Sequence, residues 1–315
     1  MFFPRFCLCI NMQNRGQGQY HRDIMRISHY YWLMKPIAEM SGAEARGICY
    51  ILMDIDDTLT RDGKLLASSY TALWKLKEAG LKVIPVTGRP AGWCDLIARE
   101  WPVDGVVGEN GALAFWEEPH PEVKQEAGAM GRPSTPVRLP VLKAEYHPNA
   151  VKNDHPVLEK IKKRALTEFP ELRPAKDQFS RLFDIALDFA EEDPVLPLSA
   201  AQRVKAIAEE EGAIAKISSI HVNIWMGNYD KLSMAERFLA HRFGWKSGAE
   251  DNKVIFVGDS PNDEPMFKRF PLACAVANIH RYKEFLNHFP AFVAFKECGE
   301  GFAEIADVIL RANNK

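Results

Sequence analysis

The chain has 315 residues, of which 47% are hydrophobic and 26% charged, and its 40 basic and 42 acidic residues leave a formal net charge of −2. This composition is ordinary for a globular protein, and the length suffices for about two domains. The near-neutral charge argues against a nucleic-acid partner, and no apolar run reaches the roughly 18 residues of a membrane-spanning helix. We therefore expect neither nucleic acid nor a membrane as a partner.

The N-terminal stretch is apolar over residues 1–10, but Pro4 and Arg5 interrupt it, and residues 11–30 show no periodicity. We expect no signal peptide, because the apolar run is too short and no pattern of small residues for cleavage follows. Residues 1–47 are predicted to form a poorly ordered extension. The six cysteines include no Cys-x-x-Cys pair, which fits a reducing, cytoplasmic location.

From Ile48 onward, short apolar runs alternate with helical segments. The pattern predicts three strands and two helices, with the strands at 48–53, 82–86 and 104–107 and the helices at 69–79 and 91–100. Strands that alternate with helices are typical of a parallel sheet covered on both faces. We therefore predict a doubly wound α/β core domain and assign residues 48–111 to its first part.

The alternation stops after residue 111, where four prolines lie between residues 117 and 136. Helices at 157–169 and 198–211 and strands at 181–189 and 214–225 follow. We predict that residues 112–227 form an inserted α+β cap domain, with hinges near Ala112 and Gly227. In residues 228–315 strands and helices alternate again, and we predict that these residues form the second part of the core. Its predicted helices lie at 230–243, 262–269 and 302–311, and its strands at 253–257, 272–276 and 291–295.

Polar side chains follow four of the predicted core strands: Asp54 and Asp56, Thr87, Asn110, and Asp259. Ligands of an open parallel sheet bind outside the carboxyl ends of its strands, so these side chains should share one edge. Several acids in one place repel one another unless a cation lies among them, and oxygen ligands suit Mg²⁺. A carboxylate can attack phosphorus, and a second acid nearby can protonate the leaving oxygen and later activate water. The sequence thus predicts Mg²⁺-assisted phosphoryl transfer.

Three further kinds of group can hold the phosphoryl oxygens in such a site. The hydroxyl of Thr87 and the backbone N–H groups after Asp54 are donors, and Lys231 opens the helix before the strand that ends at Asp259. Phosphoryl transfer depends on positioning and on charge neutralisation, and this set of groups offers both.

These residues form motifs that resemble those of haloacid-dehalogenase-type (HAD) phosphohydrolases. In chain order, the motifs are Asp54-Ile55-Asp56-Asp57-Thr58-Leu59-Thr60, Val86-Thr87-Gly88-Arg89, Lys231 and Gly258-Asp259-Ser260-Pro261-Asn262-Asp263. The place of the insertion, together with segments 108–112 and 299–302, resembles the sugar-phosphatase branch with an α/β cap. That branch includes Cof-type, sucrose-phosphate, mannosyl-3-phosphoglycerate and trehalose-phosphate phosphatases and phosphomannomutase.

The resemblance implies a role for each motif residue. Asp54 would be the nucleophile and a Mg²⁺ ligand, and Asp56 the general acid/base, which also reaches the metal through its backbone carbonyl. Asp259 would be a further metal ligand, and Asp263 would lie just behind the ligands. Binding of the phosphate and the substrate falls to five residues: Thr87, Gly88, Asn110, Lys231 and Asn262.

Two positions depart from the family's pattern. Many relatives have glycine where Asp57 and Leu232 stand in this chain. Leu232 makes the lysine motif less distinctive, so Lys253 and Lys216 remain alternatives to Lys231.

The insertion also contains candidate substrate contacts. Strand period two places Ser219, His221, Asn223 and Trp225 on one face of the segment. This polar face can look toward the site and bind sugar hydroxyls, which makes His221 and Asn223 candidates for substrate selection. The alternative is a half-exposed strand whose histidine is satisfied locally. Three nearby acids are expected on a solvated face: Asp184, Asp188 and Glu191.

Taken together, these residues predict a Mg²⁺-dependent phosphatase that hydrolyses a phosphomonoester of a small metabolite, with a sugar phosphate favoured, through an aspartyl-phosphate intermediate. One alternative is a phosphomutase on the same scaffold, which returns the phosphoryl group to another hydroxyl. A second is a signalling receiver domain, which also uses Asp, Mg²⁺, Thr and Lys. The receiver is disfavoured because the acceptor lies on the first strand and a large domain interrupts the sheet. The oligomeric state stays open.

Overall fold

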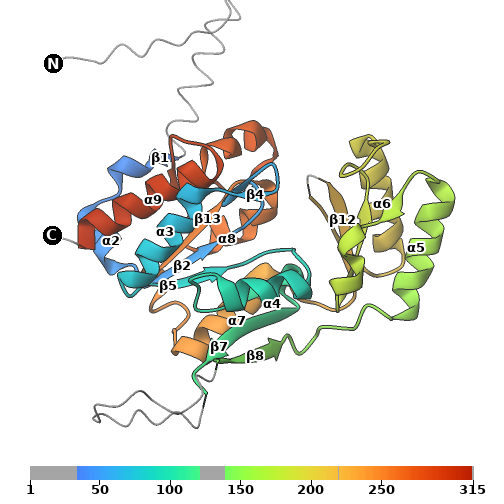
Figure 1. Cartoon of the computed structure of the whole chain (residues 1–315). Coiled ribbons are helices and arrows are strands. Elements are labelled where there is room, and N and C mark those ends of the chain that lie inside the picture. Colours follow the sequence, from blue (N-terminus) through green and yellow to red (C-terminus); the bar gives the residue numbers. More distant parts are fainter. Residues whose placement is uncertain (1–33, 121–138, 219, 314–315) are drawn as a thin grey trace, which may run out of the picture.

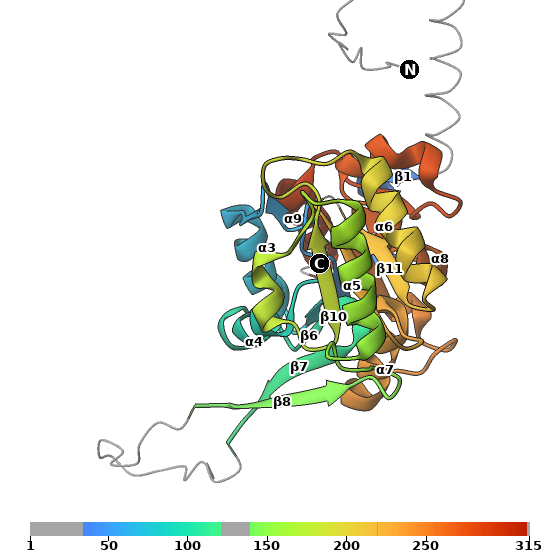
Figure 2. The same cartoon turned by 90° about the vertical axis from the view of Figure 1, so that its right-hand side faces the viewer.

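The computed structural model describes residues 34–120, 139–218 and 220–313. It has two lobes, a larger core built on a parallel sheet and a smaller cap beside it (Figures 1 and 2). No helix among the described residues is long and apolar enough to cross a bilayer.

The core sheet has six strands in the order β1-β15-β14-β13-β2-β5, and each neighbouring pair is parallel. This confirms the predicted doubly wound α/β core. The strands are β1 (Lys35–Pro36), β2 (Tyr50–Met53), β5 (Lys82–Pro85), β13 (Val254–Gly258), β14 (Cys274–Ala275) and β15 (Phe292–Val293).

Helices cover both faces of the core sheet because successive residues of its central strands point to opposite sides. Ile51 and Val257 belong to the apolar cluster that includes α3 and α9, whereas Leu52 and Phe256 belong to the cluster that includes α7 and α8. The core helices are α2 (Gly42–Gly47), α3 (Ala67–Glu78), α4 (Ala91–Glu100), α7 (Lys231–Phe243), α8 (Glu264–Arg269) and α9 (Cys298–Asn313).

The remaining core elements are short. A two-stranded hairpin, β3 (Thr60–Arg61) with β4 (Lys64–Leu65), follows the first motif. The 3-10 turns of the core are η1 (Ile37–Glu39), η2 (Glu109–Gly111), η4 (Asp251–Lys253), η5 (Pro261–Asp263) and η6 (Ala277–Phe285).

The predicted cap boundary at residue 112 needs a correction. β6 (Val106–Gly108), β7 (Leu113–Glu118) and β8 (Val141–Tyr146) form an antiparallel sheet, and one parallel bridge from Val86 to Val107 ties it to the core. Ala114 of β7 lies in the core cluster with Phe238 of α7. The segment that stands apart therefore begins after Tyr146. Part of the predicted loop at 117–136 lies outside the described residues.

The cap is an antiparallel sheet with two helices on its outer face. Its strand order is β11-β12-β10-β9, and one apolar cluster joins the sheet to both helices. The two helices lie on the side of the cap away from the core (Figure 1). The elements are α5 (Pro156–Glu168), β9 (Arg173–Pro174), η3 (Lys176–Ser180), β10 (Asp184–Asp188), α6 (Leu198–Glu210), β11 (Ile214–Ile217) and β12 (His221–Trp225).

The two chain crossings between core and cap lie against each other. Asn149 donates a hydrogen bond from Nδ2 to the carbonyl of Asn228 at 3.0 Å. Gly227 has φ +102°, and a Cβ at this position would lie 1.9 Å from the Asn149 carbonyl oxygen. Only glycine fits such a close approach. The first crossing thus lies near Asn149 and not near Ala112, and the second lies near Gly227. Hinge motion at these crossings stays a prediction.

The predicted extension over residues 1–47 is wrong for its last part, whereas residues 1–33 lie outside the described residues. β1 pairs with β15, and Ser41 begins α2 with a capping box to Glu44. Ile37 is 1% exposed and belongs to the core cluster. Residues 34–47 therefore contribute to the core.

This correction predicts that Ile37→Ala lowers the free energy of unfolding by about 2–4 kcal/mol, because it deletes buried methyl groups. Glu39→Ala, an exposed neighbour in the same turn, should change it by less than about 0.5 kcal/mol. Urea denaturation of both variants measures the difference. Equal stabilities would mean that this segment does not belong to the cooperative core.

Candidate active site

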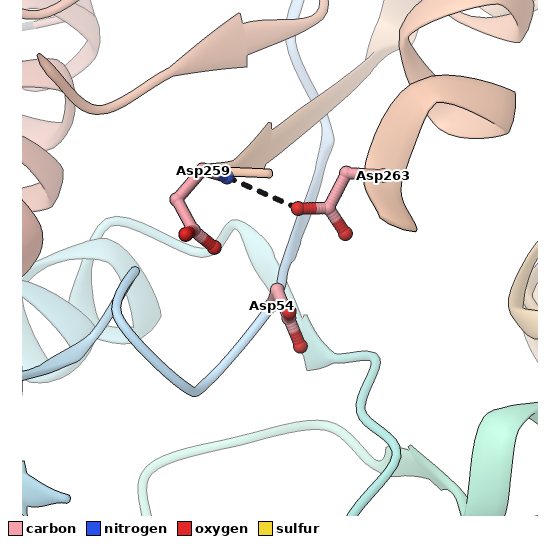
Figure 3. A group of neighbouring side chains, drawn as sticks. All are labelled: Asp54, Asp259 and Asp263. Atoms are coloured by element: carbon pink, nitrogen blue, oxygen red, sulfur yellow. Dashed lines mark hydrogen bonds between the residues drawn. The ribbon is translucent and has the colours of Figure 1, made fainter. Parts of the chain in front are cut away.

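The ends of β2 and β13 lie side by side, and they bring together acids that are about 200 residues apart in sequence. Met53 pairs with Val257, and the backbone N–H of Asp54 donates to the Val257 carbonyl at 2.9 Å. Carboxylate oxygens of Asp54, Asp259 and Asp263 lie within 4.8 Å of one another (Figure 3). All three residues are buried. The structure thus forms an acidic cluster, here defined as these three carboxylates, at the carboxyl edge of the sheet.

Hydrogen bonds hold Asp259 in place within the acidic cluster. Asp263 accepts the backbone N–H of Asp259 at 3.0 Å through Oδ2, while its buried Oδ1 accepts no hydrogen bond from the described residues. A Cβ on Gly258 would lie 2.4 Å from Asp263 Oδ2, so the glycine permits this approach. The Thr58 hydroxyl donates to Asp259 at 3.1 Å, and Asn278 donates to it at 3.5 Å.

Lys231 supplies the positive charge at the acidic cluster. Its Nζ lies 3.0 Å from Asp54 Oδ1 and 3.6 Å from Asp263 Oδ1. The lysine is the first residue of α7, whose N-cap Asp230 forms a capping box with Ser233. The unexpected Leu232 packs partly buried against the core. Of the alternatives to Lys231, Lys253 pairs with Glu250 instead.

Burial and the neighbouring charges shift the pKa values of Asp54, Asp259 and Lys231. Burial raises the pKa of Asp54 to about 7, with Lys231 opposing the shift and Asp263 and Asp56 adding to it. Burial also raises the pKa of Asp259, and the charges of Asp263 and Asp54 add to the shift. Burial disfavours the charged form of Lys231, but Asp54 and Asp263 outweigh it, so the lysine pKa lies above its usual value.

Asp56 does not join the acidic cluster, contrary to the expectation that its side chain meets Asp54 and Asp259. Its carboxylate is 49% exposed and accepts hydrogen bonds from Arg89 Nε and, at 2.6 Å, from Arg89 Nη2. The guanidinium of Arg89 in turn stacks 4.3 Å from the ring of Trp93. Arg89 lies in a predicted motif but received no role from the sequence, because nothing in its spacing indicates its partner.

Asp57 replaces a glycine of the family's pattern at a left-handed position. Its φ is +55°, a conformation that Asp adopts more readily than most side chains. The substitution is therefore compatible with the backbone of the first motif.

Of the predicted phosphate-binding and substrate-binding residues, Lys231 contacts Asp54, whereas several others contact the cap. Thr87 is buried, and its hydroxyl accepts the Arg89 N–H at 3.1 Å. The carbonyl of Gly88 accepts a hydrogen bond from Asn223 Nδ2 at 3.4 Å. Asn262 donates to the carbonyl of Ile217 in the cap at 3.1 Å. The cap strands thus lie directly over these motif residues.

Glu109 anchors the beginning of the central cap strand to the core, and the sequence analysis missed it. Its carboxylate accepts four backbone N–H groups, from Ala91, Leu182, Phe183 and Asp184, at 2.6–3.2 Å. Burial and the charge of Asp184 raise the pKa of Glu109 to about 7, although its N–H donors oppose the shift.

Asp184 completes this link and is fully buried, so its expected place on a solvated face is wrong. It accepts hydrogen bonds from Arg181 at 2.9 Å, Asn110 at 3.1 Å and Asn223 at 3.3 Å. Arg181 also donates to the Gly88 carbonyl at 3.3 Å. Asn110, which has φ +55°, therefore directs its amide toward the cap.

Asp188 also differs from the expectation of a solvated face, whereas Glu191 is exposed as expected. His221 is 7% exposed, and its Nε2 lies 2.8 Å from a carboxylate oxygen of Glu191. Asp188 is buried and accepts the backbone N–H groups of Ala190 and Glu191 at 3.0 and 2.7 Å. On the polar face of β12, His221 therefore contacts Glu191 within the cap, whereas Asn223 donates a hydrogen bond to the core.

With this geometry in place, comparison with known proteins becomes informative. The sequence model of one family, described as haloacid dehalogenase-like hydrolase, matches residues 51–127 and 143–289. Among curated protein sequences none matches the chain significantly.

Solved structures share the fold at low sequence identity. Protein 0175 of Thermoplasma acidophilum is 20% identical with a TM-score of 0.58, covering 84% of this chain and 98% of its own. A HAD/COF-like hydrolase of Plasmodium vivax is 17% identical with a TM-score of 0.56, covering 85% and 98%. The sucrose-phosphatase of Synechocystis sp. PCC6803 is 15% identical with a TM-score of 0.51, covering 85% and 98%.

The raised pKa of Glu109 predicts a pH dependence of stability. A carboxyl group that binds its proton more tightly in the folded state stabilises the fold below its ordinary pKa of 4.5, and this contribution is lost as the pH rises to about 7. Between about pH 5 and about pH 7.5, the wild type should lose roughly 1–3 kcal/mol more than Glu109→Gln, which cannot titrate. Urea denaturation across this range measures both slopes.

The exposed Glu171→Gln provides the matched control and should follow the wild-type slope. Parallel curves for the wild type and Glu109→Gln would contradict the assignment, because they would mean that Glu109 binds its proton equally in both states.

Proposed function

Because the chain belongs to the haloacid dehalogenase-like hydrolase family, we propose that it is a phosphatase that hydrolyses a phosphomonoester of a small metabolite, with a sugar phosphate as the favoured class. The observation that carries the proposal is the contact of Asp54 with Lys231 beside Asp259 and Asp263. A carboxylate next to a fixed cation suits attack on an anionic phosphoryl group.

We further propose that the acidic cluster binds Mg²⁺. The residues fit this ion, because carboxylates are its preferred protein ligands and a buried oxygen of Asp263 has no hydrogen-bond donor among the described residues. Asp54 and Asp259 would hold the ion, with the Asp56 backbone carbonyl as a third protein ligand and Asp263 supporting Asp259. Bound Mg²⁺ would neutralise negative charge on the phosphoryl oxygens.

In the proposed reaction, Asp54 attacks phosphorus in line while Lys231 and Thr87 hold the phosphoryl oxygens. The bond from phosphorus to the substrate oxygen breaks, and Asp56 gives that oxygen a proton. Water then attacks the aspartyl-phosphate and passes a proton to Asp56, which releases inorganic phosphate and regenerates Asp54. The pair with Arg89 holds the Asp56 carboxylate outside the acidic cluster, and we propose that it acts from this position.

The cap supports a small substrate rather than a polymer. It contacts the core through Asn262 to Ile217 and through Asn223 to Gly88, on motif residues themselves. One solved structure with this fold is a sucrose-phosphatase and another a trehalose-6-phosphate phosphatase related protein, which favours a sugar phosphate. Four described cysteines are free thiols, in keeping with the proposed cytoplasmic location. Nucleic acid and membranes are not proposed as partners.

The proposed nucleophile predicts that Asp54→Asn lowers phosphate release by about 10⁴-fold or more, because the amide cannot form the aspartyl-phosphate. The assay is release of inorganic phosphate from a panel of phosphorylated sugars with Mg²⁺ present. Asp62→Asn, in an exposed turn outside the acidic cluster, serves as the control and should keep its activity.

Near-normal turnover by Asp54→Asn would refute the proposal. Phosphorus NMR of the products separates the two outcomes of transfer: a phosphatase yields inorganic phosphate, whereas a phosphomutase yields an isomeric sugar phosphate.

The proposed metal site predicts that MgCl₂ raises the thermal unfolding midpoint, because a ligand that binds only the folded state stabilises it by about 2.7 kcal/mol at a hundred times its Kd. Asp259→Asn should lose most of this shift, and Asp62→Asn should retain it. Differential scanning fluorimetry over a Mg²⁺ titration measures both. An equal shift in the two variants would place the ion elsewhere.

A further inference from the structure

Lys216 lies on the face of the cap sheet that is turned toward the core. It is directly opposite Asn223 in the pairing of β11 with β12, so the two side chains share a face. Asn223 on this face reaches the Gly88 carbonyl of the core, and Trp225 packs in the core cluster. The alternate residues Ala215 and Ile217 pack instead with the helices of the cap.

Two hydrogen bonds fix the backbone around Lys216 above the candidate active site. The next residue, Ile217, accepts a hydrogen bond from Asn262 in the fourth motif at 3.1 Å. The residue opposite, Asn223, donates to Gly88 in the second motif at 3.4 Å. Lys216 therefore lies between the two points where the cap contacts the phosphate-binding motifs.

The charge of Lys216 is uncompensated in the described part of the chain. Its side chain is exposed, and no hydrogen bond or ion pair joins it to another described residue. The other cations around the site have carboxylate partners: Lys231 with Asp54, Arg89 with Asp56, and Arg181 with Asp177 and Asp184. An ammonium group without a partner, on a strand position that faces a candidate anion-binding site, suits an anionic group of the ligand.

We propose that Lys216 binds a carboxylate of the substrate and so selects phosphomonoesters that carry a second anionic group. This inference rests on the proposed function and narrows its substrate class. A carboxylate matches the single charge of Lys216, whereas a second phosphate carries more charge and more acceptors than one lysine can satisfy.

The test compares substrates that differ only in a carboxylate. One pair is 3-phosphoglycerate and glycerol 3-phosphate, and the other is 6-phosphogluconate and sorbitol 6-phosphate. The wild type should favour the carboxylate member in kcat/KM. Lys216→Gln should lower this preference by about 10–100-fold, chiefly through KM, and Lys216→Arg should largely restore it, because a charged hydrogen bond is lost in one variant and kept in the other.

Lys163→Gln is the matched control, since it removes an exposed lysine from α5 on the outer helices of the cap. It should leave the preference as in the wild type. An equal loss in Lys216→Gln and Lys163→Gln would overturn the proposal in favour of a general effect of cap charge. An unchanged preference in Lys216→Gln, or none in the wild type, would also overturn it.

Binding measurements separate this inference from the proposed function. Isothermal titration calorimetry in the Asp54→Asn background, with Mg²⁺, reads the affinity for each pair without turnover. Tighter binding of the carboxylate member, lost in Asp54→Asn/Lys216→Gln, supports the role of Lys216 even if no substrate is hydrolysed. Equal binding of both members overturns it even if the phosphatase is active. A Lys216 effect confined to fructose 1,6-bisphosphate against fructose 6-phosphate would assign a second phosphate instead and refute the carboxylate.

Discussion

The repulsion among three buried carboxylates is the constraint on which this structure depends. Parallel pairing of β2 with β13 forces Asp54 and Asp259 to the same edge, and Asp263 lies within 4.8 Å of both. Like charges at this separation in a low-dielectric place cost several kcal/mol unless compensated. Lys231 compensates part of this cost, and backbone N–H groups compensate part at Asp263. The remaining imbalance makes the site receptive to a cation.

A second buried network joins the cap to this edge. Glu109 and Asp184 receive hydrogen bonds from the backbone of the cap and from Arg181 and the amides of Asn110 and Asn223. Removal of one partner from such a network leaves a buried charge unsatisfied, so its members act together. The orientation of β10 and β12 therefore depends on the same loops that carry the phosphate-binding motifs.

The sequence indicated the core and the acidic edge because both follow from local pattern. Apolar runs that end in Asp54 and Asp259 identify buried strands and their carboxyl ends without knowledge of the tertiary structure. Asp184 has no such signal, since a fully buried acid in a strand alternates like an exposed one until its partner Arg181 is placed. The sequence also contains no signal for β1. A strand of two residues is too short to show an alternating pattern, and its partner β15 lies more than 250 positions away. The role of Arg89 becomes apparent only from the structure, where the Asp56 side chain points away from the acidic cluster and pairs with Arg89.

The two connections between core and cap, at Asn149 and at Gly227, lie side by side and would therefore act as one pivot for rotation of the cap. β12 ends beside that pivot, so along this strand a rotation would move Trp225 least and His221 most. Asn223 and Ile217 lie at neighbouring positions of the paired strands, because Asn223 pairs with Lys216 and Val222 pairs with Ile217. A rotation about this pivot would therefore break the contact of Ile217 with Asn262 and the contact of Asn223 with Gly88 together. The second and the fourth motif would thus be uncovered in one movement.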